Sequence, residues 1–263
     1  MINWAHWHNE PYLVGGLILL GWAYAVVTGP LRERLAGIGA PFPGRQAASF
    51  YTALVLFYLA VGSPLDQVGE RFLFSAHMVQ HQILMYPSAI LFVLGLPTWL
   101  VDRYAARPGW SQLGRLLTRP IPAGIAYVVT QTAWHVPAMY DWALQDRLVH
   151  VIEHVTFFAT SLLYWWPLLS PSAAWPRVSY PAQMVYLIAV TIGLTPLFAF
   201  IVFSPEVLYP TYEFAPRLIA GFDAADDQLL AGVIMKLGGL IVTLTAFAVV
   251  FYRWYRKSEH RVS

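Results

Sequence analysis

One stretch of the chain, from Phe72 to Val101, contains no aspartate, glutamate, lysine or arginine. A helix needs only about 20 apolar residues to cross the hydrocarbon core of a bilayer. The whole chain shares this bias, because 58% of its 263 residues are hydrophobic and 11% are charged. A soluble domain carries about 25% charged residues. We therefore expect lipid, rather than water, to cover most of the surface.

Seven stretches of the sequence are long and apolar enough to be transmembrane helices. They run approximately over residues 11–28, 46–65, 72–101, 120–140, 148–170, 178–205 and 228–252. Six spans would remain if the first stretch, which contains three glycines, lay in the membrane interface instead. We favour seven. The expected fold is an all-α, polytopic membrane helix bundle with seven transmembrane helices in one domain, residues 1–263.

The basic residues predict how this bundle is oriented, since lysine and arginine are enriched in cytoplasmic loops. They gather after the first, third and fifth stretches and in the tail, at Arg32, Arg34, Arg45, Arg103, Arg107, Arg115, Arg119, Arg177, Arg253, Arg256, Lys257 and Arg261. The opposite side holds only Arg71, Arg147 and Arg217. The N-terminus is therefore expected outside and the C-terminus in the cytoplasm. Most acidic residues fall on the outer side, where they would attract a cation.

Histidines form the strongest local pattern. His77 and His81 begin the third stretch, His150 and His154 begin the fifth, and His135 lies near the outer end of the fourth. Residues four apart lie on the same face of a helix. Two such pairs on facing helices can supply several nitrogens to one ion, so the sequence predicts a metal site at a shared depth near the outer face.

The donor types limit which metal such a site would take. The chain has no cysteine, which excludes thiolate sites and disulfides. Thioethers are available nearby, at Met78, Met85, Met139 and Met235. Imidazole suits copper and zinc alike, and thioether favours copper. We expect copper, with Cu(I) favoured and zinc as the alternative metal.

Some of these residues also have structural interpretations. A histidine such as His135, taken alone, is usually hydrogen-bonded rather than a ligand, and His6 and His8 beside Trp4 and Trp7 are typical of interfacial anchoring. Glu153 and Lys236 are ionisable residues within predicted spans, where such residues are normally paired or functional. They could form an ion pair with each other. Alternatively, Glu153 could orient a metal-binding imidazole without itself binding the metal.

Several segments, in order, resemble the CtaG family of bacterial cytochrome c oxidase (caa-type) assembly factors, of the polytopic membrane type. The segments are SPLD (63–66), HMVQHQILM (77–85), GLP (95–97), WHVPAMYDWAL (134–144), HVIEHVTFF (150–158), LLYWWPLL (162–169) and DQLLAGVIMK (227–236). They cover most of the chain between about residues 50 and 240. In the last segment the sequence departs from the family's pattern, because Ala231-Gly232 precedes Ile-Met and Lys236 follows it.

The resemblance implies a multi-pass protein of the bacterial inner membrane that acts as an assembly factor and not as an enzyme. It would help copper reach the oxidase, as a metallochaperone, with oxidase subunits and a periplasmic copper donor as partners. Carried over by position, the histidine pairs are the expected ligands. The stretch from Asp227 to Met235 is also similar to the family.

Three other functions remain open from the residues alone. His150, Glu153 and His154 fit the H-x-x-E-H pattern of some zinc hydrolases, in which the glutamate is a general base. Histidines on facing helices could instead be axial haem ligands of a b-type cytochrome. A transporter with a polar outer vestibule is the third alternative. The net charge of +2 gives no reason to expect a nucleic-acid partner.

Overall fold

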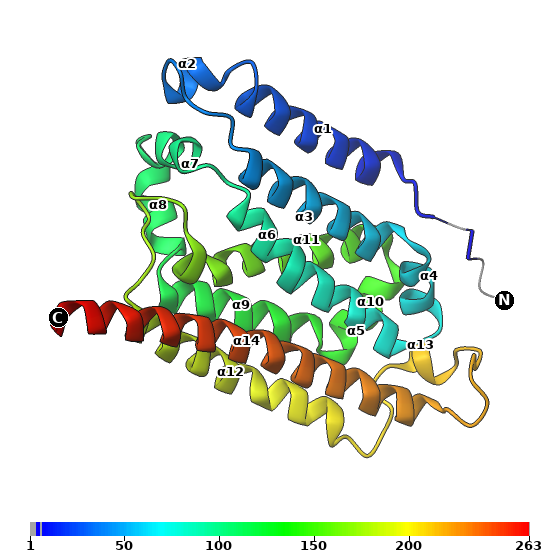
Figure 1. The fold of residues 1–263 in the computed structure, drawn as a ribbon. Helices are drawn as coiled ribbons and strands as arrows, with labels where there is room; N and C mark the ends of the chain where they lie inside the picture. Colours follow the sequence, from blue (N-terminus) through cyan, green and yellow to red (C-terminus); the bar gives the residue numbers. More distant parts are fainter. Residues whose placement is uncertain (1–3, 6, 263) are drawn as a thin grey trace.

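The computed structural model describes residues 4, 5 and 7–262, with side chains as far as Glu259, and every regular element in these residues is helical. Figure 1 shows long helices lying side by side as a bundle, with short helices at both ends. The long segments are α1 (Pro11–Thr28), α3 (Gly44–Gly62), α5 (Phe74–Ile83) continued by η1 (Leu84–Ser88) and α6 (Ala89–Leu94), α9 (Pro120–Trp134), α11 (Arg147–Leu169), α12 (Tyr180–Val202) and α14 (Ala224–Val262).

Four of these helices, α1, α11, α12 and α14, are long and apolar enough to cross a membrane on their own. Two bent pairs raise the number of candidate spans to as many as six. They are α3 with α4 (Pro64–Arg71), bent by 43°, and the α5–α6 segment with α7 (Thr98–Ala105), bent by 89°. The prediction of an all-helical, multi-pass membrane protein is therefore confirmed. The count of seven spans stays a prediction.

The helix boundaries differ from the predicted stretches where capping residues and prolines interrupt an apolar run. The predicted span 46–65 is divided at Ser63, whose hydroxyl accepts a hydrogen bond from Leu65 N at 3.2 Å and begins α4. Within the predicted span 72–101, the long helical segment ends at Leu94. Pro97 then precedes α7, which runs in a different direction. Proline has no N–H and starts helices more readily than it continues them.

The fourth and seventh predicted stretches also change. The fourth, 120–140, is divided before Pro137, so that α9 has only 15 residues and α10 (Pro137–Gln145) begins a separate helix. The seventh, 228–252, is longer than predicted, because α14 continues through the basic tail to Val262. The first, fifth and sixth stretches agree with α1, α11 and α12 within about three residues.

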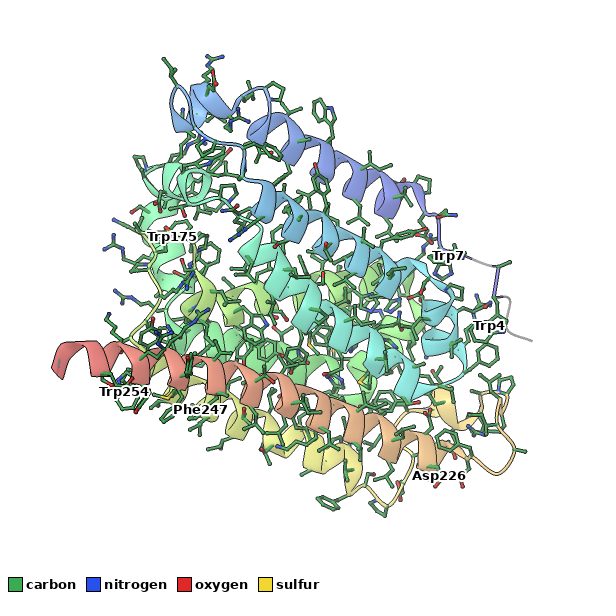
Figure 2. The ribbon with its side chains drawn as sticks, in the orientation of Figure 1. Trp4, Trp7, Trp175, Asp226, Phe247 and Trp254 are labelled. Carbon is green, nitrogen blue, oxygen red and sulfur yellow. The ribbon has the colours of Figure 1, made fainter. Side chains whose placement is uncertain are left out.

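The two ends of the bundle differ in chemistry. One end, here called the histidine end, carries α4, α10 and α13 (Pro210–Glu213), and the N-terminal segment reaches it. The other, the basic end, carries α2 (Arg32–Ala36), α7, α8 (Trp110–Leu117) and the C-terminal part of α14. Figure 2 places Trp7 and Asp226 at the histidine end and Trp175 and Trp254 at the basic end. The predicted segregation of acidic and basic loops thus corresponds to opposite ends of one bundle.

Asp227, in the first turn of α14, fixes the start of α5. Its carboxylate accepts hydrogen bonds from Phe74 N at 2.6 Å and Ser75 N at 3.1 Å, although it lies 153 residues away from Phe74. The first N–H groups of a helix have no partner within the helix, so a carboxylate at this position stabilises α5 as an N-cap does. Because Phe74 and Ser75 are only 1% and 6% exposed, these N–H groups would lack water as an alternative partner.

We therefore predict that Asp227→Ala lowers the free energy of unfolding by about 1–2 kcal/mol, the usual cost of losing a helix cap. Thermal unfolding of the purified protein in detergent measures this change. Hydrogen exchange at Phe74 and Ser75 should accelerate at the same time. Asp226→Ala, at the exposed neighbouring position, is the matched control. Unchanged exchange at the start of α5 in the Asp227 variant would contradict the capping role.

Candidate metal centre

The predicted histidine layer comes together inside the histidine end of the bundle. α5 supplies His77 and His81, and α11 supplies His150, Glu153 and His154. All five residues are buried: Glu153 and His77 are 0% exposed, and the most exposed, His150, reaches 8%. The i, i+4 spacing works as expected, because each pair turns both rings toward the other helix. The ring centroids of His77 and His154 are 5.8 Å apart, and those of His81 and His154 are 5.4 Å apart.

Four of these residues can offer ligand atoms to one point. One donor atom each of His77, His150, Glu153 and His154 lies within 4.8 Å of the others. We call these four residues the central group. His81 is next to it, with its Nε2 2.9 Å from His77 Nε2 and 3.8 Å from Glu153 Oε1. Two imidazole nitrogens at 2.9 Å share either a proton or a cation. His81 is therefore an additional candidate metal ligand.

A hydrogen bond on its far side fixes the ring of His150. Its Nδ1 lies 2.8 Å from Oε1 of Glu70, in α4, and donates its hydrogen to that carboxylate. A neutral imidazole has one N–H and one lone pair, so this bond leaves the lone pair on Nε2. Metal-binding histidines are commonly oriented by a carboxylate in this way. The Nε2 atom is 3.9 Å from Glu153 Oε2.

Two tyrosines hold the ring of His77. Tyr212 in α13 donates its hydroxyl hydrogen to Gly69 O at 2.8 Å, and the Tyr140 hydroxyl lies 2.9 Å from Tyr212 Oη. His77 Nδ1 is 2.9 Å from the Tyr140 hydroxyl and 3.1 Å from that of Tyr212. A consistent chain of donors runs from His77 Nδ1–H to Tyr140, then to Tyr212 and Gly69. The lone pair of His77 is then on Nε2, which faces His81 Nε2 at 2.9 Å.

Unpartnered polar atoms mark the middle of the centre. Both carboxylate oxygens of Glu153, Nε2 of His150 and Nε2 of His154 are buried and have no hydrogen-bond partner. Burying an ionised carboxylate without a partner costs several kcal/mol, and the cost is removed when a cation is bound. Three imidazole nitrogens and a carboxylate are a donor set that suits a borderline metal ion such as copper or zinc. The residues present therefore fit a metal.

His135 lies beside the centre rather than in the central group. It follows α9, where its Nδ1 donates to Gln131 O at 2.7 Å and its Nε2 is 3.5 Å from the sulfur of Met78. Its ring centroid is 6.0 Å from that of His81. Met85 lies deeper, with its sulfur 2.6 Å from Gln131 Nε2. The structure thus joins Met78 to His135, as a nitrogen–sulfur pair that flanks the central group.

The remaining candidate residues have other positions. Met139 and Met235 pack in the hydrophobic core, and Asp227 caps α5 as described above. Lys236 points away from the centre, with Nζ 3.1 Å from Thr195 Oγ1 and over the ring of Phe198. The ion pair considered between Glu153 and Lys236 is therefore wrong. The two ion-pair contacts of Glu153 among the described residues are with His81 and His150.

The N-terminal histidines have different outcomes. His6 lies outside the described residues. His8 reaches the histidine end, where its ring contacts the carboxylate of Asp66 and its backbone N–H donates to Gly62 O at 2.8 Å. The hydrogen bond with Asp66 raises the pKa of His8 above its ordinary value. His8 is next to Trp7 in the sequence, and it is also hydrogen-bonded to residues at the histidine end of the bundle.

Sequence analysis did not identify Glu70, Asp66, Tyr140 or Tyr212 as part of this site. The acidic residues were recognised only as outer-side charges, and the tyrosines are indistinguishable by pattern from the other aromatic residues of the chain. Only the packing of α4, α10 and α13 over the end of the bundle brings them to the histidines.

The geometry also bears on two of the alternative functions. A lipid hydrolase must admit its substrate to the metal, whereas the residues of the centre are only 0–8% exposed. A bis-histidine haem site needs a porphyrin between imidazoles of facing helices, whereas His81 and His154, on α5 and α11, contact each other edge-on, with ring centroids 5.4 Å apart. The arrangement suits a small ion.

Comparison with known proteins identifies the family. The sequence model of the cytochrome c oxidase caa3 assembly factors (Caa3_CtaG) matches residues 22–257, nearly the whole chain. No curated protein and no solved structure matches the sequence. The matched range includes every histidine of the centre, and the resemblance seen in the ordered sequence segments agrees with it. The chain belongs to the cytochrome c oxidase caa3 assembly factor family.

Proposed function

We propose that this protein binds a copper ion in the central group and assists the metallation of a haem–copper oxidase. The observation that carries this proposal is a set of buried atoms without hydrogen-bond partners, from Glu153, His150 and His154, in a group of residues that can bring one ligand atom each to within 4.8 Å of one another. A buried carboxylate without a hydrogen-bond partner is costly unless it takes up a proton or a cation balances its charge. A bound cation supplies that compensation, and the family supplies the process in which the cation would be used.

Copper suits the surroundings of the centre better than zinc. The central group alone offers nitrogen and oxygen, which suit either metal. The adjacent pair of His135 Nε2 and Met78 sulfur adds a thioether at 3.5 Å. A metal bound to both, with bond lengths of about 2.0 Å to nitrogen and about 2.3 Å to sulfur, would separate them by about 3.5 Å at a tetrahedral angle. This thioether supports Cu(I), and zinc remains the alternative metal.

The proposed role is that of a donor or assembly partner and not that of an enzyme. Ligation by imidazole and carboxylate, without cysteine, holds copper less firmly than a thiolate cage and allows it to leave. The oxidase subunits are the proposed recipients and a periplasmic copper protein the proposed source. The acidic residues of the histidine end would attract the ion or dock its carrier.

We further propose that the bundle crosses the bacterial inner membrane seven times with its histidine end outside. α9 would be the seventh span, although it has only 15 residues. It packs against α11 and α12 alongside the other long helices, and α10 continues beyond it. The arginines of α2, α7, α8 and the tail all lie at the opposite end, which favours that end as the cytoplasmic one.

Because the chain has no cysteine, single cysteines can report this topology. Gln112 and Gln145 are exposed residues on the two sides of α9. We expect a membrane-impermeant maleimide, added outside, to label Gln145→Cys in the intact membrane and Gln112→Cys only after permeabilisation. The unmodified protein is the matched control. Labelling of both cysteines from one side would show that α9 does not cross, and reversed labelling would overturn the orientation.

The metal site is tested by metal analysis of the protein purified under reducing conditions. We expect about one copper per chain in the unmodified protein and almost none in a His77→Ala/His154→Ala double variant, since half of the central group is lost. Copper at 100 times its dissociation constant should also stabilise the unmodified protein by about 2.7 kcal/mol. Thermal unfolding with and without copper measures this effect.

Lys236→Met is the control for this experiment, because it removes an intramembrane charge that faces Thr195 rather than the centre. It should bind as much copper as the unmodified protein. Equal copper in the histidine double variant and the unmodified protein would eliminate the site, and zinc in place of copper would change the metal assigned to it.

The role in oxidase maturation is tested in cells that make a caa3-type oxidase and lack their own copy of this protein. Expression of the unmodified chain or of Lys236→Met should restore the copper content of the purified oxidase and its oxidation of cytochrome c. The His77→Ala/His154→Ala variant, present in the membrane at the same level, should restore neither. An oxidase fully loaded with copper in that variant would show that assembly does not depend on the centre.

A further inference from the structure

A second group of possible metal ligands lies between the central group and the end of the bundle. Donor atoms of Asp66, Glu70 and His150 lie within 4.8 Å of one another. The ring of His8 contacts Asp66 from the outside through Nδ1. We call His8, Asp66, Glu70 and His150 the outer group. It contains two imidazoles as well as two carboxylates, which is a ligand set and not merely an acidic patch.

The outer group and the central group share one residue, His150. Its Nδ1 is 2.8 Å from Glu70 Oε1, on the outer side, and its Nε2 is 3.9 Å from Glu153 Oε2, on the inner side. Nε2 is buried and has no hydrogen-bond partner. A neutral imidazole has a lone pair on one nitrogen at a time. His150 can therefore serve an ion in either group, and it serves the two in succession rather than together.

Burial of the residues increases along the same line. The side chains of His8 and Glu70 are 23% and 25% exposed, that of Asp66 is 4% exposed, and Glu153 is fully buried. The residues thus form a continuous series of donors from the solvent to the centre. A bare cation cannot enter a low-dielectric interior without ligands at each step, because the loss of its hydration must be compensated.

The outer group is also held in place by its surroundings. Gln80 is fully buried and donates from Nε2 to Asp66 Oδ1 at 2.7 Å and to Ala60 O at 2.9 Å. This fixes one oxygen of Asp66 and leaves Oδ2 facing His8. The segment that carries His8 is anchored at two points, by the backbone hydrogen bond from His8 N to Gly62 O and by the ion pair between Glu10 and Arg147.

We propose that the outer group is an uptake site, which takes copper from the solvent or from its carrier and passes it to the central group through His150. The ion first displaces the proton shared by His8 and Asp66, which leaves to the solvent. As the ion binds Nδ1 of His150 beside Glu70, the ring hydrogen moves from Nδ1 to Nε2, on the side of Glu153. As the ion then moves to Nε2, that hydrogen returns to Nδ1 and to its bond with Glu70, so the ring carries one hydrogen throughout. This inference rests on the proposed copper centre, but it predicts the rate of copper uptake, which can be measured separately from the final amount of copper bound.

The test compares the rate of copper uptake with its final amount. The purified protein, reduced and free of metal, is mixed with Cu(I) in its coloured bicinchoninate complex, and the loss of colour follows the transfer. We expect Asp66→Asn and His8→Gln each to slow uptake by about tenfold, the lower end of the range for electrostatic and ligand-assisted capture. The final copper per chain should equal that of the unmodified protein, because neither residue belongs to the central group.

Two choices of variant keep this experiment decisive. Asp141→Asn neutralises another acidic residue of the histidine end, outside both groups, and should take up copper at the unmodified rate. His8→Gln changes no helix residue, so it reports the uptake site even if Asp66→Asn unfolds the protein. Glu70 is left unchanged because it also orients His150 for the central group.

The possible outcomes separate the two proposals. Uptake by His8→Gln and Asp66→Asn at the unmodified rate would overturn the uptake site and leave the copper centre standing. A reduced final amount in both variants would also overturn it, because these residues would then be ligands of the final site. If the unmodified protein takes no copper from the complex, the copper centre itself fails, and the uptake site fails with it.

Discussion

The rest of the histidine end is organised around the buried carboxylate of Glu153, which has imidazole neighbours but no hydrogen bond. Its side chain is fully buried and neither of its oxygens has a hydrogen-bond partner. The nearest imidazole nitrogens, from His81 and His150, are 3.8 and 3.9 Å away, which is too far for hydrogen bonds and leaves space for an ion between them. In a bilayer no water can relieve this deficit, so such a residue is kept only with a partner or a function.

The short helices at the histidine end determine how well that site is formed. α4 supplies Glu70, which orients His150, and α10 and α13 supply Tyr140 and Tyr212, which orient His77. Asp227 fixes the start of the helix that carries His77. Each interaction fixes a ring or a helix start from outside the centre, and each comes from a segment far away in sequence. Such external positioning would keep the ligands of the proposed metal centre in place with or without an ion.

The long helices and the spacing of the histidines could be predicted from the sequence, whereas the points at which helices are interrupted could not. Long apolar runs predict α1, α11 and α12 well, since burial in lipid requires little beyond length and hydropathy. Hydropathy is averaged over many residues, so it did not register the interruptions at Ser63 and Pro97, which are single-residue effects of capping and of the missing proline N–H. The i, i+4 pairing of the histidines was predictable because it depends only on the period of one helix.

By itself, the sequence determined that this chain is an all-helical membrane protein with two histidine pairs at one level, because local periodicity and apolar length need no knowledge of partners. Only the tertiary structure decided which donors meet: His135 lies with Met78, Lys236 turns to Thr195, and Glu70 reaches His150. These contacts join segments up to many tens of residues apart, and a helix surface offers the same side chain several equally good neighbours. The choice among them is made by the packing of helices against one another, which no local pattern encodes.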